Sequence, residues 1–477
     1  MNYETVIGIE IHAELRTKSK IYCGCTTEFG GEPNTHCCPI CTGMPGVLPV
    51  LNRSVVEYAV KAGLAMNCSI SEFSKQDRKN YFYPDLPKAY QVSQFDLPLC
   101  KGGSVEIEAG GKSKIIGITR IHIEEDAGKL MHDEWETGTL VDFNRCGVPL
   151  IEIVSEPDMR SPEEAKAFVE NVKSILEYLD VSDCKMQEGS LRADINLSVR
   201  PVGQEKFGTR TEMKNLNSFR SILRAAENET QRQIKEIEAG GVILQETRRW
   251  DDNKGYSYAM RSKEEAHDYR YFPEPDLVPV VVDGEWLGRI RTSLPELPAA
   301  RRSRYISEYG LPEYDAGLLT SSRYLADFFE EAVRESSNTK AVSNWIMGDM
   351  MRLLKDKALE ADSVPFPASH LAALVSLIDK GTISGTIAKK VFEKMFETGK
   401  SPQLIVKEEG LEVVSDTGAL SEAVRKVLEA NPQSVADYKS GKEKAFGFLV
   451  GQAMREMKGK ADPQTINKLL KEELAKC

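Results

Sequence analysis

Four cysteines near the N-terminus have the residue types and spacing of a metal site. Cys23 and Cys25 form one close pair, and Cys38 and Cys41 form a second pair after 12 intervening residues. If the chain folds back on itself, the pairs supply four thiolates, the set that tetrahedral zinc prefers. Four cysteine ligands leave no open position, so the sequence predicts structural rather than catalytic zinc. The alternative is reduced, metal-free thiols, with Cys37 as one more neighbour.

The same region invites comparison with zinc deaminases, which combine His-x-Glu with a later Pro-Cys-x-x-Cys. The chain has His12-Ala-Glu14 ahead of Cys38-Pro-Ile-Cys41. However, Pro39 follows the first cysteine instead of preceding it, and the Cys23–Cys25 pair would have no role. The pattern therefore argues against a deaminase.

Carboxylates and imidazoles recur inside strand-like runs. Glu10 and His12 stand two residues apart, which places both side chains on one face of a strand. Further acids lie in other such runs: Glu124, Glu125 and Asp126 after His122, then Glu152, Asp194 and Glu212. Inward-pointing carboxylates are costly unless they are paired or bind a cation, and an oxygen-rich set with an imidazole suits Mg²⁺. The alternative is that these acids face solvent or pair with arginines, namely Arg120, Arg145, Arg192 or Arg210.

Two further segments bear on nucleotide or nucleic-acid chemistry. Gly111-Lys112-Ser113 resembles the end of a Walker A loop, but Glu106 stands where its first glycine belongs. Gly110–Gly111 instead fits a hairpin turn. Between Arg78 and Lys88, cations alternate with aromatic residues, a pattern that can contact phosphates and stack on bases. An exposed loop anchored by its tyrosines is the simpler interpretation of that segment.

Composition bounds the class of protein. The chain has 477 residues, 41% hydrophobic and 28% charged, which is typical of a soluble globular protein of about three domains. No run approaches the ~20 apolar residues of a membrane span, and the N-terminus lacks a targeting pattern, so we expect a cytoplasmic protein. A net charge of −11 argues against non-specific coating of nucleic acid. In a reducing compartment the ten cysteines favour metal ligands or core residues over disulfides.

The elements that must position these residues form an α+β fold. Alternating strands dominate residues 1–294, with helices inserted after Ser161-Pro162 and between Asn217 and Gly240–Gly241. Residues 295–404 and 405–477 are almost wholly helical in pattern, with a seam near Gly399–Pro402. The sequence thus predicts a β-rich cradle domain, an all-α middle domain and a small all-α tail domain.

Several long blocks resemble a known family. ETVIGIEIHAEL, CPICTGMPGVLPVLN, DRKNYFYPDLPKAYQVSQ, DFNRCGVPLIEIVSEPDMRSPEEA and GTRTEMKNLNSFR are similar to the B subunits of tRNA-dependent amidotransferases. ETRRWDD, DYRYFPEPDLVP and GFLVGQAMREMKGKADP extend the resemblance to the C-terminal region. It therefore covers essentially the whole chain.

The resemblance implies an ATP-dependent ligase that converts Glu on tRNA(Gln), or Asp on tRNA(Asn), into its amide. An amidase-type A subunit would make ammonia from glutamine, and a small C subunit would hold the two together. ATP would activate the carboxylate as an acyl phosphate with the help of Mg²⁺. A non-catalytic tRNA-binding adaptor is the alternative function. The longer archaeal relative is a further alternative, but this chain lacks its inserted domain.

The resemblance also assigns residues. Glu10, His12 and Glu125 become the first-choice Mg²⁺ ligands, with Glu152, Asp194 and Glu212 nearby, and Glu124 or Glu125 stays an open choice. Lys79 and Lys88 become candidates to meet ATP or the acyl phosphate, or to line the ammonia route. The resemblance implies that zinc at Cys23, Cys25, Cys38 and Cys41 would at most support the structure, because some family members lack these cysteines.

The tail resembles a small free-standing helical protein, and its cations could follow the outer body of tRNA through phosphate contacts. These candidates are Arg425, Lys426, Lys442, Lys444, Arg455, Lys458 and Lys460. A solvated helix face is the alternative, because acids nearly balance them locally.

Overall fold

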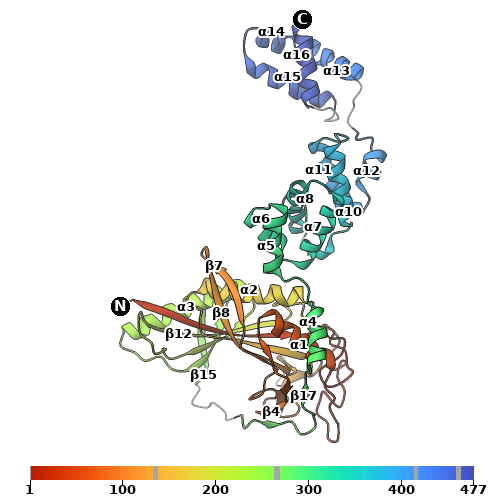
Figure 1. Cartoon of the computed structure of the whole chain (residues 1–477). Helices are drawn as coiled ribbons and strands as arrows, with labels where there is room; N and C mark the ends of the chain where they lie inside the picture. Colours follow the sequence, from red (N-terminus) through yellow and green to blue (C-terminus); the bar gives the residue numbers. More distant parts are fainter. Residues whose placement is uncertain are drawn as a thin grey trace. The chain divides into compact units, whose positions relative to one another are not determined.

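The structure, a computed structural model, describes residues 2–132, 138–262, 269–357, 359, 361–412, 417–457 and 463–476. The chain divides into two compact units, Met1–Leu297 and Pro298–Cys477. The first is built on sheets with helices packed against them, and the second is helical, which confirms the predicted α+β class (Figure 1).

A ten-stranded sheet organises the first unit, in the order β15-β14-β13-β12-β1-β11-β8-β6-β2, with β7 paired to β8. Its pairings are antiparallel except for the parallel pair β13–β14. The strands are β1 (Tyr3–Glu14), β2 (Ser69–Ile70), β6 (Cys100–Lys101), β7 (Ser104–Ala109), β8 (Lys112–Glu125), β11 (Pro149–Ser155), β12 (Leu191–Pro201), β13 (Thr211–Leu216), β14 (Glu246–Asp251) and β15 (Tyr256–Ser262). β7 and β8 turn at Gly110 and Gly111, both with positive φ, so the predicted hairpin is confirmed.

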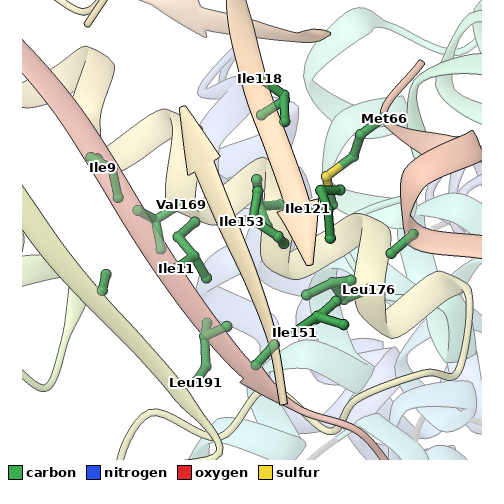
Figure 2. Close-up of a cluster of buried hydrophobic side chains, with 14 of the residues drawn as sticks. Ile9, Ile11, Met66, Ile118, Ile121, Ile151, Ile153, Val169, Leu176 and Leu191 are labelled. Atoms are coloured by element: carbon green, nitrogen blue, oxygen red, sulfur yellow. The ribbon is translucent and has the colours of Figure 1, made fainter. Parts of the chain in front are cut away.

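Alternation along β1 separates the two faces of this sheet. Ile7, Ile9 and Ile11 are buried in the apolar core, while the side chains between them, including Glu10 and His12, take the other face. Figure 2 shows Ile9 and Ile11 with isoleucines of β8 and β11 beside side chains of α2. The apolar face is therefore sealed, and the polar face is left for chemistry.

Three of the helices that contribute to that core are α1 (Arg53–Ala65), α2 (Pro162–Tyr178) and α3 (Phe219–Glu238). Ser161 caps α2 by accepting a hydrogen bond from the Glu164 backbone N–H, as its position before Pro162 predicts. α3 begins after Ser218 and ends just before Gly240, whose φ of +80° stops the helix. Both predicted helices are confirmed.

Small sheets and one helix complete the unit. β4 (Asp77–Asn80) lies between β16 (Phe272–Pro273) and β5 (Tyr90–Ser93), β3 (Phe73–Ser74) pairs with β17 (Val280–Val281), and β9 (Lys129–His132) pairs with β10 (Thr139–Asp142). α4 (Gly284–Thr292) packs Trp286 on the core, and the indole N–H donates to Glu57 at 2.9 Å. Leu294 and Leu297 also pack there, and the compact unit ends at Leu297; the predicted domain boundary at 294 stays a prediction.

The second unit consists of short helices. They are α5 (Pro298–Tyr309), α6 (Glu313–Leu319), α7 (Arg323–Glu335), α8 (Thr339–Trp345), the π-helical turn η2 (Ile346–Met350), α9 (Met351–Asp356), η3 (Ala361–Ser363), α10 (Ala368–Asp379), α11 (Gly385–Thr398), α12 (Pro402–Glu408), α13 (Thr417–Ala430), α14 (Pro432–Lys439), α15 (Glu443–Glu456) and α16 (Pro463–Lys476). Leu420, Val424, Leu449, Ile466 and Leu470 form an apolar core shared by α13, α15 and α16. The separate tail domain, with its boundary at 404/405, stays a prediction. No helix among the described residues is long and apolar enough to span a membrane.

Candidate active site and cysteine cluster

A row of polar side chains crosses the sheet on the face opposite the core. Register pairs His12 of β1 with Glu152 of β11, and Glu152 in turn with His122 of β8. His12 Nε2 lies 3.5 Å from Glu152 Oε2 and 3.4 Å from Glu124 Oε1. One ligand atom from each of His12, Glu124 and Glu152 lies within 4.8 Å of the others, a spacing that a single cation can bridge. Strands distant in sequence thus bring two carboxylates and an imidazole together.

Both carboxylates of this cluster are held ionised although they are buried. Burial raises the pKa of Glu152, but the charges of His122 and His12 outweigh this effect and hold it well below its usual range. Burial likewise lowers the pKa of His122, but Glu152 and Glu124 raise it to about 9. His122 Nδ1 is buried without a hydrogen-bond partner among the described residues. The two carboxylates are therefore ionised and paired with the imidazoles, whose protons a bound cation would displace.

The structure places Glu124, not Glu125, beside His12. Glu125 points to the other side of β8, where its carboxylate pairs with Lys88 and accepts a hydrogen bond from the Val92 backbone N–H at 2.9 Å. Adjacent residues of a strand face opposite ways, so only one of the two glutamates can join the cluster. The structure thus brings Glu124, and not the first-choice Glu125, into the group with His12 and Glu152, while the metal ligands themselves stay a prediction.

Three more predicted ligands form a neighbouring group around a lysine. Glu10 is paired in register with Asp194 and accepts a hydrogen bond from Asn196 Nδ2 at 2.9 Å. Lys214 Nζ lies 2.6 Å from Asp194 Oδ2 and 2.9 Å from Glu212 Oε1. Burial, together with the charges of the surrounding acids, raises the pKa of Glu10. The six predicted acids and imidazole therefore separate into the His12–Glu124–Glu152 cluster, this lysine-neutralised group, and Glu125.

A cavity of about 530 Å³ opens over both groups. His12, Glu124 and Asp194 line it together with cationic side chains, namely Lys79, Arg145, Arg192, Lys214 and Arg249. Arg192 Nη2 and Arg145 Nε lie 2.8 and 3.4 Å from Asp126 Oδ2, so arginine pairing is the right interpretation for that acid. Arg120 also approaches Glu152, at 3.8 Å. The cavity wall therefore combines acids, which attract a metal ion, with cations, which attract an anionic substrate.

The two predicted lysines line different cavities. Lys79 Nζ lies 5.0 Å from the ring centre of Tyr269 and 5.8 Å from that of Tyr81, on the wall of the larger cavity. Burial lowers the pKa of Lys79, but Glu124, Tyr271 and Glu152 together outweigh this effect, so the net shift is upward. Lys88, with Glu125, lines a separate cavity of about 190 Å³ that also touches Cys23 and Cys41.

The four predicted cysteines converge. Ligand atoms of Cys23, Cys25, Cys38 and Cys41 all lie within 4.8 Å of one another. Cys41 Sγ accepts a hydrogen bond from the Cys38 backbone N–H at 3.0 Å, and Lys20 Nζ lies 3.7 Å from the same sulfur. The hydrogen bond with Cys23 lowers the pKa of Cys41 to about 5. This donor set fits zinc, whereas the Cys37 thiol instead donates to the Asn34 carbonyl at 3.3 Å.

His12 lies in the carboxylate cluster and not with these cysteines, which removes the geometric basis of a deaminase.

In the tail, the predicted cations are exposed but largely paired. Arg425, Lys426 and Lys442 lie 3.2, 2.6 and 2.9 Å from Glu473, Glu456 and Asp437, respectively. Lys444 and Arg455 are exposed on α15. Lys458 and Lys460 lie outside the described residues.

Sequence reasoning did not identify Lys214, Arg249 or Thr247, whose hydroxyl donates to Glu212 at 2.7 Å. Lys214 could have been found, because it stands two residues after Glu212 on the same strand and so shares its face. Arg249 and Thr247 could not have been found from sequence, because their place beside β13 depends on the pairing of strands distant in sequence.

A buried carboxylate–imidazole cluster beside a cation-lined cavity defines a class of protein, an enzyme that acts on anionic substrates. Residues 5–288 match the GatB/GatE catalytic domain, and residues 327–474 match a second model described as the GatB domain. The chain belongs to the family of aspartyl/glutamyl-tRNA(Asn/Gln) amidotransferase B subunits.

Relatives carrying that name agree over their full length. The chain is 66% identical to the protein of Caldicellulosiruptor bescii and 64% identical to that of Thermoanaerobacter sp. strain X514, in both cases over 100% of each chain. It is 58% identical to that of Carboxydothermus hydrogenoformans over 99% of each chain. Identity at this level over the complete length covers both units.

Proposed function

We propose that this chain binds mischarged tRNA and performs the kinase and transamidation steps of an aspartyl/glutamyl-tRNA(Asn/Gln) amidotransferase. The observation that carries this proposal is the convergence of His12, Glu124 and Glu152 beside a cation-lined cavity, whose wall includes His12 and Glu124. An adaptor that only presented tRNA to another subunit would not need such a cluster.

The reaction needs activation because a carboxylate oxygen is a poor leaving group. The side-chain carboxylate of the esterified Glu or Asp attacks the γ-phosphorus of ATP, and ADP leaves. Ammonia then attacks the acyl carbon of the resulting acyl phosphate, inorganic phosphate leaves, and the amide forms. Lys79 and Lys214 supply positive charge to the cavity where the phosphoryl group would be transferred.

The donor set supports Mg²⁺ as a cofactor. Glu124 and Glu152 offer hard oxygen ligands and His12 offers one nitrogen, while Glu10, Asp194 and Glu212 surround the position with further negative charge. A bound Mg²⁺ would neutralise charge on the transferring phosphoryl group. Zn²⁺ is proposed for the four cysteines, where it would hold the loop of residues 23–41 in place.

Ammonia is proposed to come from an amidase-type A subunit, with a small C subunit joining the two. The cavity beside Lys88 and Glu125 lies on the other side of β8 from the acid cluster and is our candidate for its entry. An enclosed route is needed because free ammonium, the main form at neutral pH, is not a nucleophile. We place the reaction in the cytoplasm, where aminoacyl-tRNA and ATP are available.

The tail is proposed to contact the tRNA backbone through its exposed cations. Lys444→Glu combined with Arg455→Glu should raise the KM for aminoacyl-tRNA and leave the turnover at saturating tRNA unchanged, because phosphate contacts position the RNA without touching the reacting atoms. Lys394→Glu, a change of charge on α11, serves as the control. An unchanged KM in the double variant would contradict this role.

The proposed function is tested by ATP hydrolysis in the assembled complex supplied with ammonium chloride. We expect ADP release only when Glu-tRNA(Gln) or Asp-tRNA(Asn) is present, with uncharged tRNA as the control. An adaptor predicts instead that the complex hydrolyses ATP normally after His12→Ala, because the chemistry would then lie in another subunit.

A further inference from the structure

The sheet edge next to the cavity displays exposed rings and a cation on the catalytic face. Register places Lys214 of β13 beside Arg249 of β14, and Arg249 beside Tyr258 of β15. Residues in register share a face of the sheet, so these three side chains form a row across three strands. Tyr256 and Met260 flank Tyr258 at two-residue spacing on β15. We call Arg249, Tyr256, Tyr258 and Met260 the β14–β15 strip.

This strip is continuous with the cavity. Lys214, Arg249 and Met260 line the cavity wall together with Glu124 and His12. Thr247, two residues before Arg249 on β14, reaches the same face and binds Glu212. The strip therefore extends outward from the acid cluster along the surface.

The opposite face of β14 is covered. Trp250 is 1% exposed, and Arg248 Nε lies 3.6 Å from the buried Glu229 of α3. In contrast, Tyr256, Tyr258 and Met260 are 47%, 42% and 55% exposed. Packing within the unit accounts for one face of this edge and leaves the rings of the other uncovered.

The local charge suits an anionic partner. Among the residues that the structure describes, no carboxylate lies within ion-pair distance of Arg249, and Lys254 Nζ lies 6.0 Å from the ring centre of Tyr256. Two acids stand at the end of β14, and both have cationic partners. Asp251 lies 3.6 Å from Lys254, and Asp252 lies 3.1 Å from Arg224. Aromatic faces combined with a cation that has no acid partner, here Arg249, are a means by which proteins bind single-stranded nucleic acid.

We propose that the β14–β15 strip binds the unpaired 3′ end of the aminoacyl-tRNA, and this inference rests on the proposed function. The side-chain carboxylate of an esterified Glu is about 7 Å from the ribose that carries it, as bond lengths of about 1.5 Å dictate. When that carboxylate reaches the cluster, the terminal nucleotides lie at the cavity mouth. Tyr258 stacks on a base, and Arg249 neutralises a phosphate of the strand.

The test uses the assembled three-subunit complex and Glu-tRNA(Gln) carrying 2-aminopurine in place of its terminal adenine, whose fluorescence falls on stacking. Tyr258→Ala should raise the KM for this tRNA about tenfold and reduce the quenching, because one stacking platform is lost. The KM for ATP, the kcat and the glutaminase activity should stay unchanged. Tyr258→Phe, which retains the ring, should behave like the unmodified complex.

Arg249→Gln provides an independent readout. Loss of one phosphate contact to a single strand should lower the slope of log affinity against log salt concentration by about 0.7. Tyr314→Ala and Arg291→Gln, two exposed side chains outside the strip, serve as matched controls.

An unchanged KM, quenching and salt slope in these variants would overturn the inference. Loss of complex assembly with unchanged tRNA affinity would also overturn it, since the strip would then bind a protein subunit. Failure of the proposed function is distinguishable, because the complex would then still hydrolyse ATP normally after His12→Ala, whatever the strip binds.

Discussion

Glu124→Gln is expected to abolish amide formation on tRNA in the assembled complex, while the glutaminase activity of the proposed A subunit continues. The loss should be about 100-fold or more, because the charge stabilisation supplied by a catalytic metal is worth several kcal/mol. The variant keeps the size of the side chain but removes one of two carboxylates that converge on His12. Amide formed from ammonium chloride and Glu-tRNA(Gln) is the quantity to measure, with glutamate release as the second readout.

Glu125→Gln is the matched control, because it makes the same chemical change one residue along the strand. Its carboxylate pairs with Lys88 beside the smaller cavity and does not face His12. We expect Glu125→Gln to retain Mn²⁺ affinity and Glu124→Gln to lose it. The reverse order of the two affinities would show that the assignment of ligands on β8 is wrong.

Cys38→Ser combined with Cys41→Ser is expected to reduce the zinc content from about one ion per chain to none and to lower the melting temperature by about 5 °C or more. A closed structural site contributes its binding free energy to folding, and its loss leaves a loop without its cross-link. Zinc content by atomic emission and thermal melting test this directly.

Cys37→Ser is the control, since that thiol hydrogen-bonds the Asn34 carbonyl and stands apart from the cluster. It should keep both the zinc and the melting temperature. Ammonium-driven amide formation should change less than stability in the double variant, because the thiols do not line the cavity over His12. A metal-free preparation with unchanged melting would refute a structural zinc site.

The part of the site that could be predicted is the part where apolar and polar residues alternate clearly along a strand. On β1, buried Ile9 and Ile11 alternate with Glu10 and His12, so their common polar face could be predicted. On β8 the residues from Ile121 to Glu125 are all buried, because β5 covers the side from which Gln91 donates to the Glu125 carbonyl at 2.8 Å. In the sequence, Ile121 to Glu124 alternate apolar and polar, but the acids continue at Glu125 and Asp126, and the choice between Glu124 and Glu125 was therefore left open.

The sequence also did not show which strands, far apart along the chain, pair with one another. The acids that Lys214 bridges, Asp194 and Glu212, lie on different strands, and nothing local to either indicates that one lysine serves both. Lys79 and Lys88 stand nine positions apart, yet they line different cavities, because Lys79 lies on β4 and Lys88 lies in the connection from β4 to β5. The cysteine cluster was predictable because all its ligands come from one short segment.

The most direct measurement is anomalous diffraction from crystals of the assembled complex grown with Mn²⁺ and a non-hydrolysable ATP analogue. We predict a manganese peak within ligand distance of His12, Glu124 and Glu152, with the analogue's phosphates beside it in the larger cavity. A manganese ion bound at Glu125 beside Lys88, or a nucleotide in the larger cavity with no ion at these three side chains, would contradict the account.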